Sequence, residues 1–239
     1  MNLDGRVIVV TGASTGIGLA VARALIAKGS IVYGIARRRA VLDRVHAELG
    51  KQFRAIPCDV RHEDAVRDAF AYVLGDAERL DVLVNNAGLG RFGPVADMPA
   101  DRWHQQMDTN LTGVFFCTRE VIPAMRTQNR LAGFGGHIVN IASIAGIIGN
   151  ANLSAYNATK FGLRGFSEAL MKELRTDGIK VTSICPGSVG TDFQVKSGSR
   201  GSPNPMHPDD IAATVVHVLE SPTNYLISEV VMRPLRPRG

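Results

Sequence analysis

The chain has few cysteines and no long apolar run, and each shortage excludes a class of protein. Neither a Cys-x-x-Cys pair nor a Cys/His cluster occurs, so we expect no disulfide framework and no metal site. No run of about 18 apolar residues is present, so no segment is expected to span a membrane. A strand-like segment follows within a few residues of Met1, which leaves no room for a signal peptide. These features predict a cytoplasmic protein with three scattered cysteines, Cys58, Cys117 and Cys185.

A strong charge of one sign is also missing. The net charge is +5 and the sequence pI is about 9.4, which could indicate a nucleic acid or a small anionic ligand. The basic residues are dispersed, except at Arg37–Arg39 and in the tail from Arg233 to Arg238, and no nucleic-acid motif accompanies them. We therefore expect a small-molecule partner and no nucleic acid. Because 45% of the 239 residues are hydrophobic, a folded core is expected rather than disorder.

Apolar strand-like runs alternate with helical patterns from end to end. This alternation predicts one α/β domain over residues 1–239, a Rossmann fold whose doubly wound parallel sheet of about seven strands has helices on both faces. A stretch rich in Ser, Gly and Pro, residues 196–208, reads as a flexible substrate loop. The expected strands are 6–11, 31–36, 53–57, 81–85, 137–141, 180–185 and 227–232, and the expected helices are 16–28, 40–49, 63–74, 99–107, 111–127, 154–175 and 208–219.

Glycines cluster between the first expected strand and the first expected helix. Gly12, Gly16 and Gly18 would let the backbone turn tightly and approach a pyrophosphate resting on helix N–H groups. A tight strand-to-helix connection without a ligand is the alternative for this turn taken alone.

The end of the second strand lacks the acid that would bind the ribose of NAD. Ala36 is followed there by Arg37 and Arg38, and an arginine can pair with a 2′-phosphate. The alternative is that these arginines are the solvated start of a helix. Asp59, which follows the third strand, could accept from an adenine amino group or cap a helix. Residues 85–88, Asn-Asn-Ala-Gly, end the fourth strand at the same rim and could pack against a ribose or hold the strands together.

The most informative pair is Tyr156 and Lys160. They lie four residues apart in an expected helix, so both side chains project from one face. Ser143 lies upstream at the end of an expected strand. Together with the glycine-rich turn, this pattern indicates a site that moves a hydride to or from a nicotinamide.

These residues resemble the classical short-chain dehydrogenase/reductase family over nearly the whole chain. The resemblance rests on residues 11–18, Asp59, residues 85–88, Asn110, Ser143, residues 156–160, Pro186-Gly187 and Thr191. It implies a catalytic tetrad of Asn110, Ser143, Tyr156 and Lys160. It also implies that NADP(H) is held by Gly12, Ser14, Thr15, Gly16, Ile17, Gly18, Arg37, Arg38, Asp59, Val60, Asn86, Ala87, Gly88, Tyr156, Lys160, Pro186, Gly187, Val189 and Thr191.

The roles that the resemblance implies can be stated chemically. Tyr156 would act as general acid for the carbonyl oxygen, and Lys160 would favour its phenolate and bond the ribose hydroxyls. Ser143 would hold the carbonyl oxygen by a hydrogen bond, and Asn110 would hold a water that relays protons to Lys160. Backbone at Pro186-Gly187 and the hydroxyl of Thr191 would lie near the carboxamide. None of the six histidines has a telling position, and all are expected to be surface or packing residues.

The substrate is less well defined by the sequence. The chain ending and residues 177–193 resemble the subgroup of NADP-dependent 3-hydroxy acid and serine-type dehydrogenases, which favours a small ketone or 3-oxo acid. The alternative enzyme is a 3-oxoacyl-[acyl-carrier-protein] reductase, and the alternative of another class is an NADPH-sensing protein without turnover. Lys196 and Arg200 could attract a carboxylate or could merely be solvated.

A homotetramer, or a homodimer, is expected. In the family, helices equivalent to residues 110–127 and 154–175 pair across a two-fold axis. Here these segments carry more apolar side chains than one face of a sheet would cover, although all six could pack internally. The six are Val114, Phe115, Phe116, Phe161, Leu163 and Phe166.

Overall fold

A computed structural model describes residues 1–134, 136–198 and 202–236. These residues form a seven-stranded sheet, all parallel, in the order β3-β2-β1-β4-β5-β6-β7. The doubly wound parallel fold predicted from the sequence is therefore confirmed, and most element ends lie within three residues of the prediction. The strands are β1 (Val7–Thr11), β2 (Ile31–Ala36), β3 (Phe53–Pro57), β4 (Val82–Asn85), β5 (Gly136–Ile141), β6 (Ile179–Pro186) and β7 (Glu229–Met232).

The central strands are apolar on both faces because helices cover both sides of the sheet. In β1, Ile8 and Val10 belong to the core on one face, while Val7 and Val9 belong to the core on the other. All five residues of this strand are buried. The period-two alternation of a strand thus feeds two separate apolar cores, which explains why the sequence shows a continuous apolar run.

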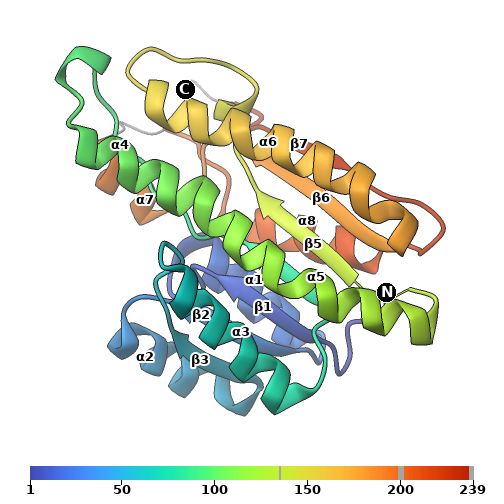
Figure 1. Cartoon of the computed structure of the whole chain (residues 1–239). Helices are drawn as coiled ribbons and strands as arrows, with labels where there is room; N and C mark the ends of the chain where they lie inside the picture. Colours follow the sequence, from blue (N-terminus) through green and yellow to red (C-terminus); the bar gives the residue numbers. More distant parts are fainter. Residues whose placement is uncertain (135, 199–201, 237–239) are drawn as a thin grey trace.

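Two helical layers enclose the sheet (Figure 1). One core is shared with α1 (Gly16–Ala27), α2 (Arg39–Leu49) and α8 (Pro208–Glu220). The opposite core is shared with α3 (Glu63–Ala77), α5 (Gly113–Ala132) and α6 (Ser154–Leu174), and α5 crosses the front of the sheet in the view of Figure 1. The short helix α4 (Ala100–Met107) precedes α5.

Two parts of the chain differ from the sequence-based prediction. A short helix, α7 (Asp192–Ser197), was not predicted, and it takes in the first two residues of the expected flexible loop. Beyond it, residues 199–201 lie outside the described residues, and Met206 pairs with Val189 in an isolated parallel bridge. Helix α7 forms because Thr191 accepts a hydrogen bond from the N–H of Phe193 at its start. The flexibility of residues 196–208 stays a prediction.

The six apolar side chains expected to form an oligomer interface do not share one environment. Val114 and Leu163 are buried in the core, and Phe116 and Phe166 are half-buried against it. Phe115 on α5 and Phe161 on α6 remain 43% and 45% exposed. The apolar excess is therefore smaller than the sequence indicated, and it is confined to these two rings.

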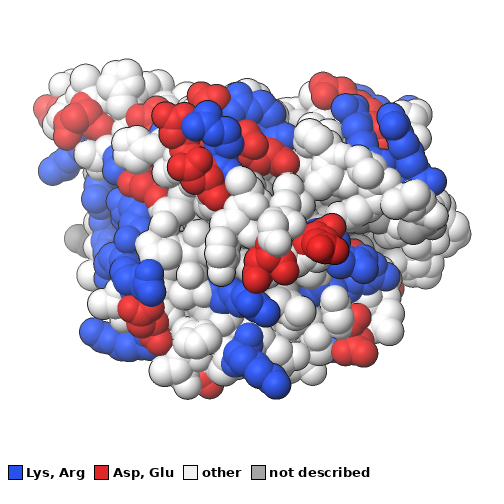
Figure 2. Space-filling model, turned by 60° about the horizontal axis from the view of Figure 1, so that its bottom comes forward, with Lys and Arg blue, Asp and Glu red and all other residues white. Residues whose placement is uncertain are grey.

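Acidic and basic side chains are interspersed on the face shown in Figure 2. Several of the basic residues form ion pairs, including Arg23 with Glu48 and Arg126 with Asp177. Within the described part of the chain, no helix is both long and apolar enough to cross a membrane.

Candidate functional site

A cavity of about 820 Å³ opens at the carboxyl ends of the strands. It is lined by residues that follow β1 to β6, the edge where open parallel sheets bind ligands. Strand order reverses between β1 and β4, and the glycine-rich turn and residues 86–90 lie on the two sides of this point. The topology therefore gathers most of the predicted cofactor and catalytic residues around one cavity, whereas Gly18 and Asn110 do not line it.

The glycine-rich turn is packed so closely that side chains are excluded. A Cβ atom on Gly18 would lie 2.3 Å from the carbonyl oxygen of Gly12. Gly12 itself has φ +68°, and a Cβ there would lie 2.8 Å from Nδ2 of Asn86. That Nδ2 atom donates to the carbonyl oxygen of Thr11 at 2.9 Å. The turn leads into α1, so free N–H groups at the helix start border the cavity, which fits a pyrophosphate.

The part of the cavity where an adenosine is predicted to bind contains basic residues. Arg37 and Arg38 line the cavity and are exposed. Asp59 also lines it, and its carboxylate accepts hydrogen bonds from the backbone N–H and the guanidinium of Arg61, with Nη2 to Oδ2 at 2.6 Å. Burial would raise the pKa of Asp59, but the Arg61 hydrogen bonds and the charges of Arg61 and Arg37 lower it overall. The carboxylate is thus ionised and fixed in orientation.

Arg61 is not among the predicted site residues, although it directly follows the predicted pair Asp59-Val60. Val60 is buried and packs so close to Gly113 that a Cβ on that glycine would lie 2.8 Å from Cγ2 of Val60. This contact joins the loop after β3 to the start of α5. Arg61 lines the cavity, as Arg37 and Arg38 do, so its lining includes three arginines close in sequence to the ends of β2 and β3.

Tyr156 and Lys160 lie in the first turns of α6, and both are buried. The Nζ atom of Lys160 lies 5.8 Å from the centre of the Tyr156 ring and donates to the carbonyl oxygen of Ile141 at 2.9 Å. Burial raises the pKa of Tyr156 to about 12, and the neighbouring hydroxyl of Ser143 opposes that rise. Burial lowers the pKa of Lys160 to about 8. The phenol therefore keeps its proton at neutral pH, while the ammonium is close to titration.

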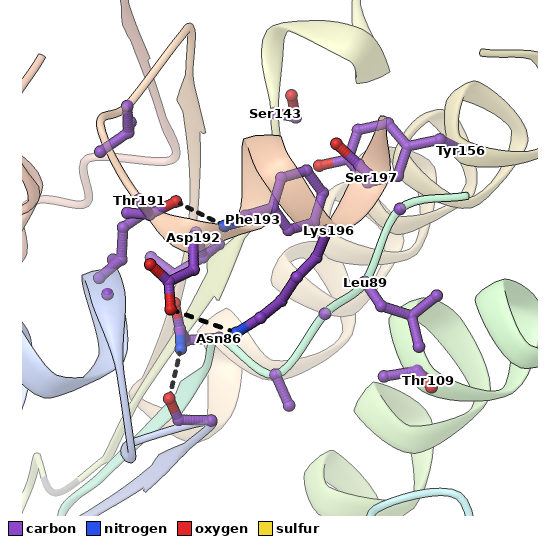
Figure 3. A pocket seen from close by; sticks show the side chains of 18 of the residues that line it. Asn86, Leu89, Thr109, Ser143, Tyr156, Thr191, Asp192, Phe193, Lys196 and Ser197 are labelled. Atoms are coloured by element: carbon purple, nitrogen blue, oxygen red, sulfur yellow. Dashed lines mark hydrogen bonds and ion pairs between the residues drawn. The ribbon is translucent and has the colours of Figure 1, made fainter. Parts of the chain in front are cut away.

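Ser143 follows β5 and faces the same cavity (Figure 3). Its Oγ atom accepts from the N–H of Ala145 at 3.1 Å and lies 3.5 Å from the carbonyl oxygen of Pro186, to which it donates. The hydroxyl also lies close enough to Tyr156 to oppose the rise in the tyrosine pKa. The structure thus brings Ser143, Tyr156 and Lys160 together.

Asn110 lies in a π-helical turn between α4 and α5, Asp108–Thr112, and is fully buried. Its Oδ1 accepts from the N–H of Leu89 and its Nδ2 donates to the carbonyl oxygen of Leu89, both at 2.8 Å. Nδ2 also donates to Oγ1 of Thr159 at 3.1 Å, so the amide joins the loop after β4 to α6. The expected water relay to Lys160 stays a prediction.

The remaining predicted cofactor residues follow β4 and β6. Asn86, Ala87 and Gly88 line the cavity after β4, and Pro186, Gly187, Val189 and Thr191 line it after β6. A Cβ on Gly16 would lie 3.2 Å from Cγ2 of Thr191, so the start of α7 contacts the glycine-rich turn. In contrast, Asn85 is buried behind the site and donates to Thr118 and Asn140, which shows that it holds strands together.

Two aromatic side chains lie beside the ring of Tyr156. Phe92, in the loop after β4, has its ring centre 5.4 Å from that of Tyr156, and Phe193 on α7 has its ring centre 5.6 Å from it. Figure 3 shows Phe193 and Lys196 extending from α7 beside the pocket. Neither a loop nor a six-residue helix shows a hydrophobic period in the sequence. The contact of these two rings with the predicted general acid is therefore visible only in the fold.

Known proteins resemble this chain in sequence and in fold. The sequence profile of the short chain dehydrogenase family matches residues 6–201. The 3-oxoacyl-[acyl-carrier-protein] reductase of a Synechocystis species is 39% identical over 195 residues, which cover 80% of this chain and 77% of the relative.

Two solved structures are similar along almost the whole chain. A serine dehydrogenase complexed with NADP⁺ is 32% identical with a TM-score of 0.87, over 95% of this chain and 94% of the other. The 3-ketoacyl-(acyl-carrier-protein) reductase of Brucella melitensis, complexed with NADH, is 27% identical with a TM-score of 0.88, over 96% of this chain and 97% of the other. Both fold and family resemblance predicted from the sequence are therefore confirmed.

Proposed function

Because the chain belongs to the short-chain dehydrogenase/reductase family, we propose that it is an NADP(H)-dependent enzyme that interconverts a ketone and a secondary alcohol. One observation carries this proposal. Tyr156 and Lys160 are buried side by side next to Ser143, in the cavity whose other end has the glycine-rich turn and three arginines. The proposed proton donor and the proposed dinucleotide-binding residues therefore line the same cavity.

In the direction of reduction, the carbonyl carbon receives two electrons with a hydride, and its oxygen receives a proton. When bound, the reduced nicotinamide supplies that hydride and becomes the oxidised form. Tyr156 donates the proton as general acid, and Ser143 donates a hydrogen bond to the carbonyl oxygen. The ammonium of Lys160 stabilises the phenolate that remains, and solvent returns a proton to it. Asn110 acts as a positioning residue, since it fixes the loop after β4 against α6.

The preference for NADP(H) is supported by Arg37, Arg38 and Arg61. No carboxylate follows β2, and the exposed guanidinium of Arg37 lies close enough to lower the pKa of Asp59. A 2′-phosphate placed here would gain charge-assisted hydrogen bonds from Arg37, while Asp59 stays available to the adenine amino group. The related solved structures bind NADP⁺ in one case and NADH in the other, so the preference depends on this chain's own arginines.

We propose a small ketone or 3-oxo acid as substrate, in line with the similarity to the serine dehydrogenase. A 3-oxoacyl-[acyl-carrier-protein] is the second candidate, because reductases of such substrates are among the proteins that this chain resembles. An NADPH-sensing role without turnover is the alternative of another class. We further propose a cytoplasmic homotetramer or homodimer, in which Phe115 and Phe161 are covered by another copy of the chain.

The test is a panel of ketones, 3-oxo acids and 3-oxoacyl thioesters, each assayed by loss of NADPH and NADH absorbance side by side. We expect turnover of ketones with NADPH preferred. Tight NADPH binding without turnover of any compound would favour the sensor. Turnover restricted to carrier-protein thioesters would favour the reductase of acyl carriers.

A further inference from the structure

Three aromatic rings meet at the substrate end of the cavity. The ring centres of Phe92 and Phe193 lie 5.4 and 5.6 Å from that of Tyr156, and 6.3 Å from each other. Tyr156 is buried, whereas Phe92 and Phe193 are half-buried and line the cavity. Part of each phenylalanine ring therefore packs against Tyr156, and the remaining part lines the cavity, where a ligand can contact it.

Hydrogen bonds fix the two segments that carry these rings. The buried side chain of Gln106 accepts from the N–H of Arg91 at 3.0 Å and donates to the carbonyl oxygen of Arg91 at 3.2 Å. The N–H of Phe92 donates to the carbonyl oxygen of Ser197 at 3.3 Å, which ties the loop after β4 to the end of α7. A Cβ on Gly90 would lie within 2.9 Å of both phenylalanine rings, so the rings fill the space over that glycine. These contacts hold the aromatic pair in place.

The charged groups nearby are already engaged. Nζ of Lys196 pairs with Oδ2 of Asp192 at 3.3 Å, and Nη1 of Arg91 donates to the carbonyl oxygen of Lys196 at 3.1 Å. Arg200, the other cation considered from the sequence, lies outside the described residues. The cavity lining also includes the apolar side chains of Ile144, Leu153 and Val189 and uncharged polar ones such as Asn150 and Gln194. The surface beside the carbonyl position is therefore better suited to an apolar group than to a carboxylate.

We propose that Phe92 and Phe193 are specificity-determining residues, and that the substrate carries a ring-sized apolar substituent, bound against these two rings, on one side of its reacting carbonyl. This inference rests on the proposed function and narrows its substrate class. The side of the carbonyl that faces away from the rings can still carry a polar or acidic group. Aromatic side chains recognise apolar rings through buried area and through edge-to-face contacts, and ring centres 5.4–6.3 Å apart match such packing.

The experiment compares two ketones that differ by one ring, phenylacetone and acetone, with NADPH as cofactor. The wild-type kcat/KM should be at least about tenfold higher for phenylacetone, since even one buried methylene group changes discrimination by about 10- to 200-fold. Phe92→Ala and Phe193→Ala should each lower this ratio several-fold, because each removes one wall. Phe92→Leu and Phe193→Leu keep apolar bulk, and they serve as the variants of choice if an alanine variant does not fold. Tyr72→Ala, which removes an exposed aromatic ring on α3 outside the cavity, is the matched control and should leave the ratio unchanged.

The ratio of kcat/KM for phenylacetone to that for acetone distinguishes two roles of the phenylalanines, namely substrate recognition and holding Tyr156 in place. If the phenylalanines only hold Tyr156 in place, both ketones lose activity together and the ratio stays constant, which overturns the proposal. Equal wild-type kcat/KM for the two ketones also overturns it, while leaving the proposed carbonyl reduction intact. If no ketone, 3-oxo acid or thioester is reduced at all, the proposed function fails and the inference falls with it.

Discussion

The ammonium group of Lys160 lies 5.8 Å from the ring centre of Tyr156, and both side chains are buried at the end of one cavity. Burial disfavours the charged form of each group, so the pKa of the phenol rises to about 12 and that of the ammonium falls to about 8. In the free protein, Tyr156 is therefore a protonated acid at neutral pH, and its neighbour is the group that titrates.

Carbonyl reduction should lose efficiency as the pH rises through about 8. Lys160 is protonated below its pKa of about 8, and above it the positive charge that stabilises the phenolate of Tyr156 is lost. The profile of kcat/KM against pH, which reports ionisations of the free enzyme, should be level near pH 7 and fall above pH 8. Lys160→Arg keeps a cation at high pH, so this fall should disappear in the variant, whatever its residual rate. A fall at the same pH in both proteins would assign the ionisation to another group.

Exchanging two residues at the end of β2 should reverse the cofactor preference. One charge-assisted hydrogen bond contributes about 1.5–3 kcal/mol, which corresponds to roughly 10- to 150-fold in affinity. We expect wild-type kcat/KM to favour NADPH by a factor in that range. Ala36→Asp with Arg37→Ser should favour NADH, because repulsion of the 2′-phosphate adds to the lost attraction. Arg39→Ser is the matched control, since Arg39 pairs with Asp43 on α2. Equal use of both cofactors by the wild type would instead assign Arg37 to the solvated surface.

The sequence predicts the sheet and much of the site because both depend on local patterns. Continuous apolar runs bounded by glycine and polar residues define buried parallel strands, and parallel strands place their carboxyl ends at one edge. Ser143 follows one such strand, whereas Tyr156 and Lys160 share one face of a helix. Because the parallel strands end at one edge of the sheet, the fold brings these residues together there.

What the sequence could not predict depends on contacts between distant segments. Arg61 matters because its guanidinium meets Asp59, and Gln106 matters because it binds the backbone of Arg91 across a loop. Phe92 and Phe193 approach each other because α7 lies against the loop after β4. Helix α7 has six residues, too few for helical periodicity to be seen.

Acid should destabilise the protein through His137, a buried histidine outside the site. Its Nε2 lies 2.8 Å from Oγ1 of Thr182, and its Nδ1 has no partner among the described residues. Burial, with Lys180 nearby, lowers the pKa of His137 from 6.5 to about 3. The unfolded chain therefore binds a proton that the folded protein does not bind between these values. Stability from this residue is complete above pH 6.5 and is lost as the pH falls towards 3.

Between pH 6.5 and about pH 3, the free energy of unfolding should fall by about 1.4 kcal/mol per pH unit because of this residue. Urea unfolding of the wild type and of His137→Gln at pH 7.5 and pH 5.5 measures it. The variant should be less stable at pH 7.5 but should lose less free energy of unfolding on acidification. His217→Gln, at an exposed position on α8, is the control. The same pH dependence in wild type and His137→Gln would assign the effect elsewhere.

Charge placed on the two exposed phenylalanines should break the proposed oligomer. Of the six apolar side chains that were expected at an interface, Phe115 on α5 and Phe161 on α6 are the two that remain exposed. Light scattering at micromolar concentration should give the mass of a tetramer or dimer for the wild type and a smaller mass for Phe115→Glu with Phe161→Glu. Tyr72→Glu, on α3, should keep the wild-type mass. A monomeric wild type would rule the assembly out.

In the proposed mechanism, the phenolic oxygen of Tyr156 carries the proton to the substrate. Single-turnover and steady-state rates of ketone reduction by Tyr156→Phe, together with its NADPH dissociation constant, test this most directly. We expect kcat to fall by about 10²–10⁴-fold or more while NADPH binding changes little, because only the hydroxyl is removed. Tyr225→Phe, which removes the hydroxyl of a half-exposed tyrosine outside the cavity, should retain full activity. A folded Tyr156→Phe protein with the wild-type kcat would refute the mechanism.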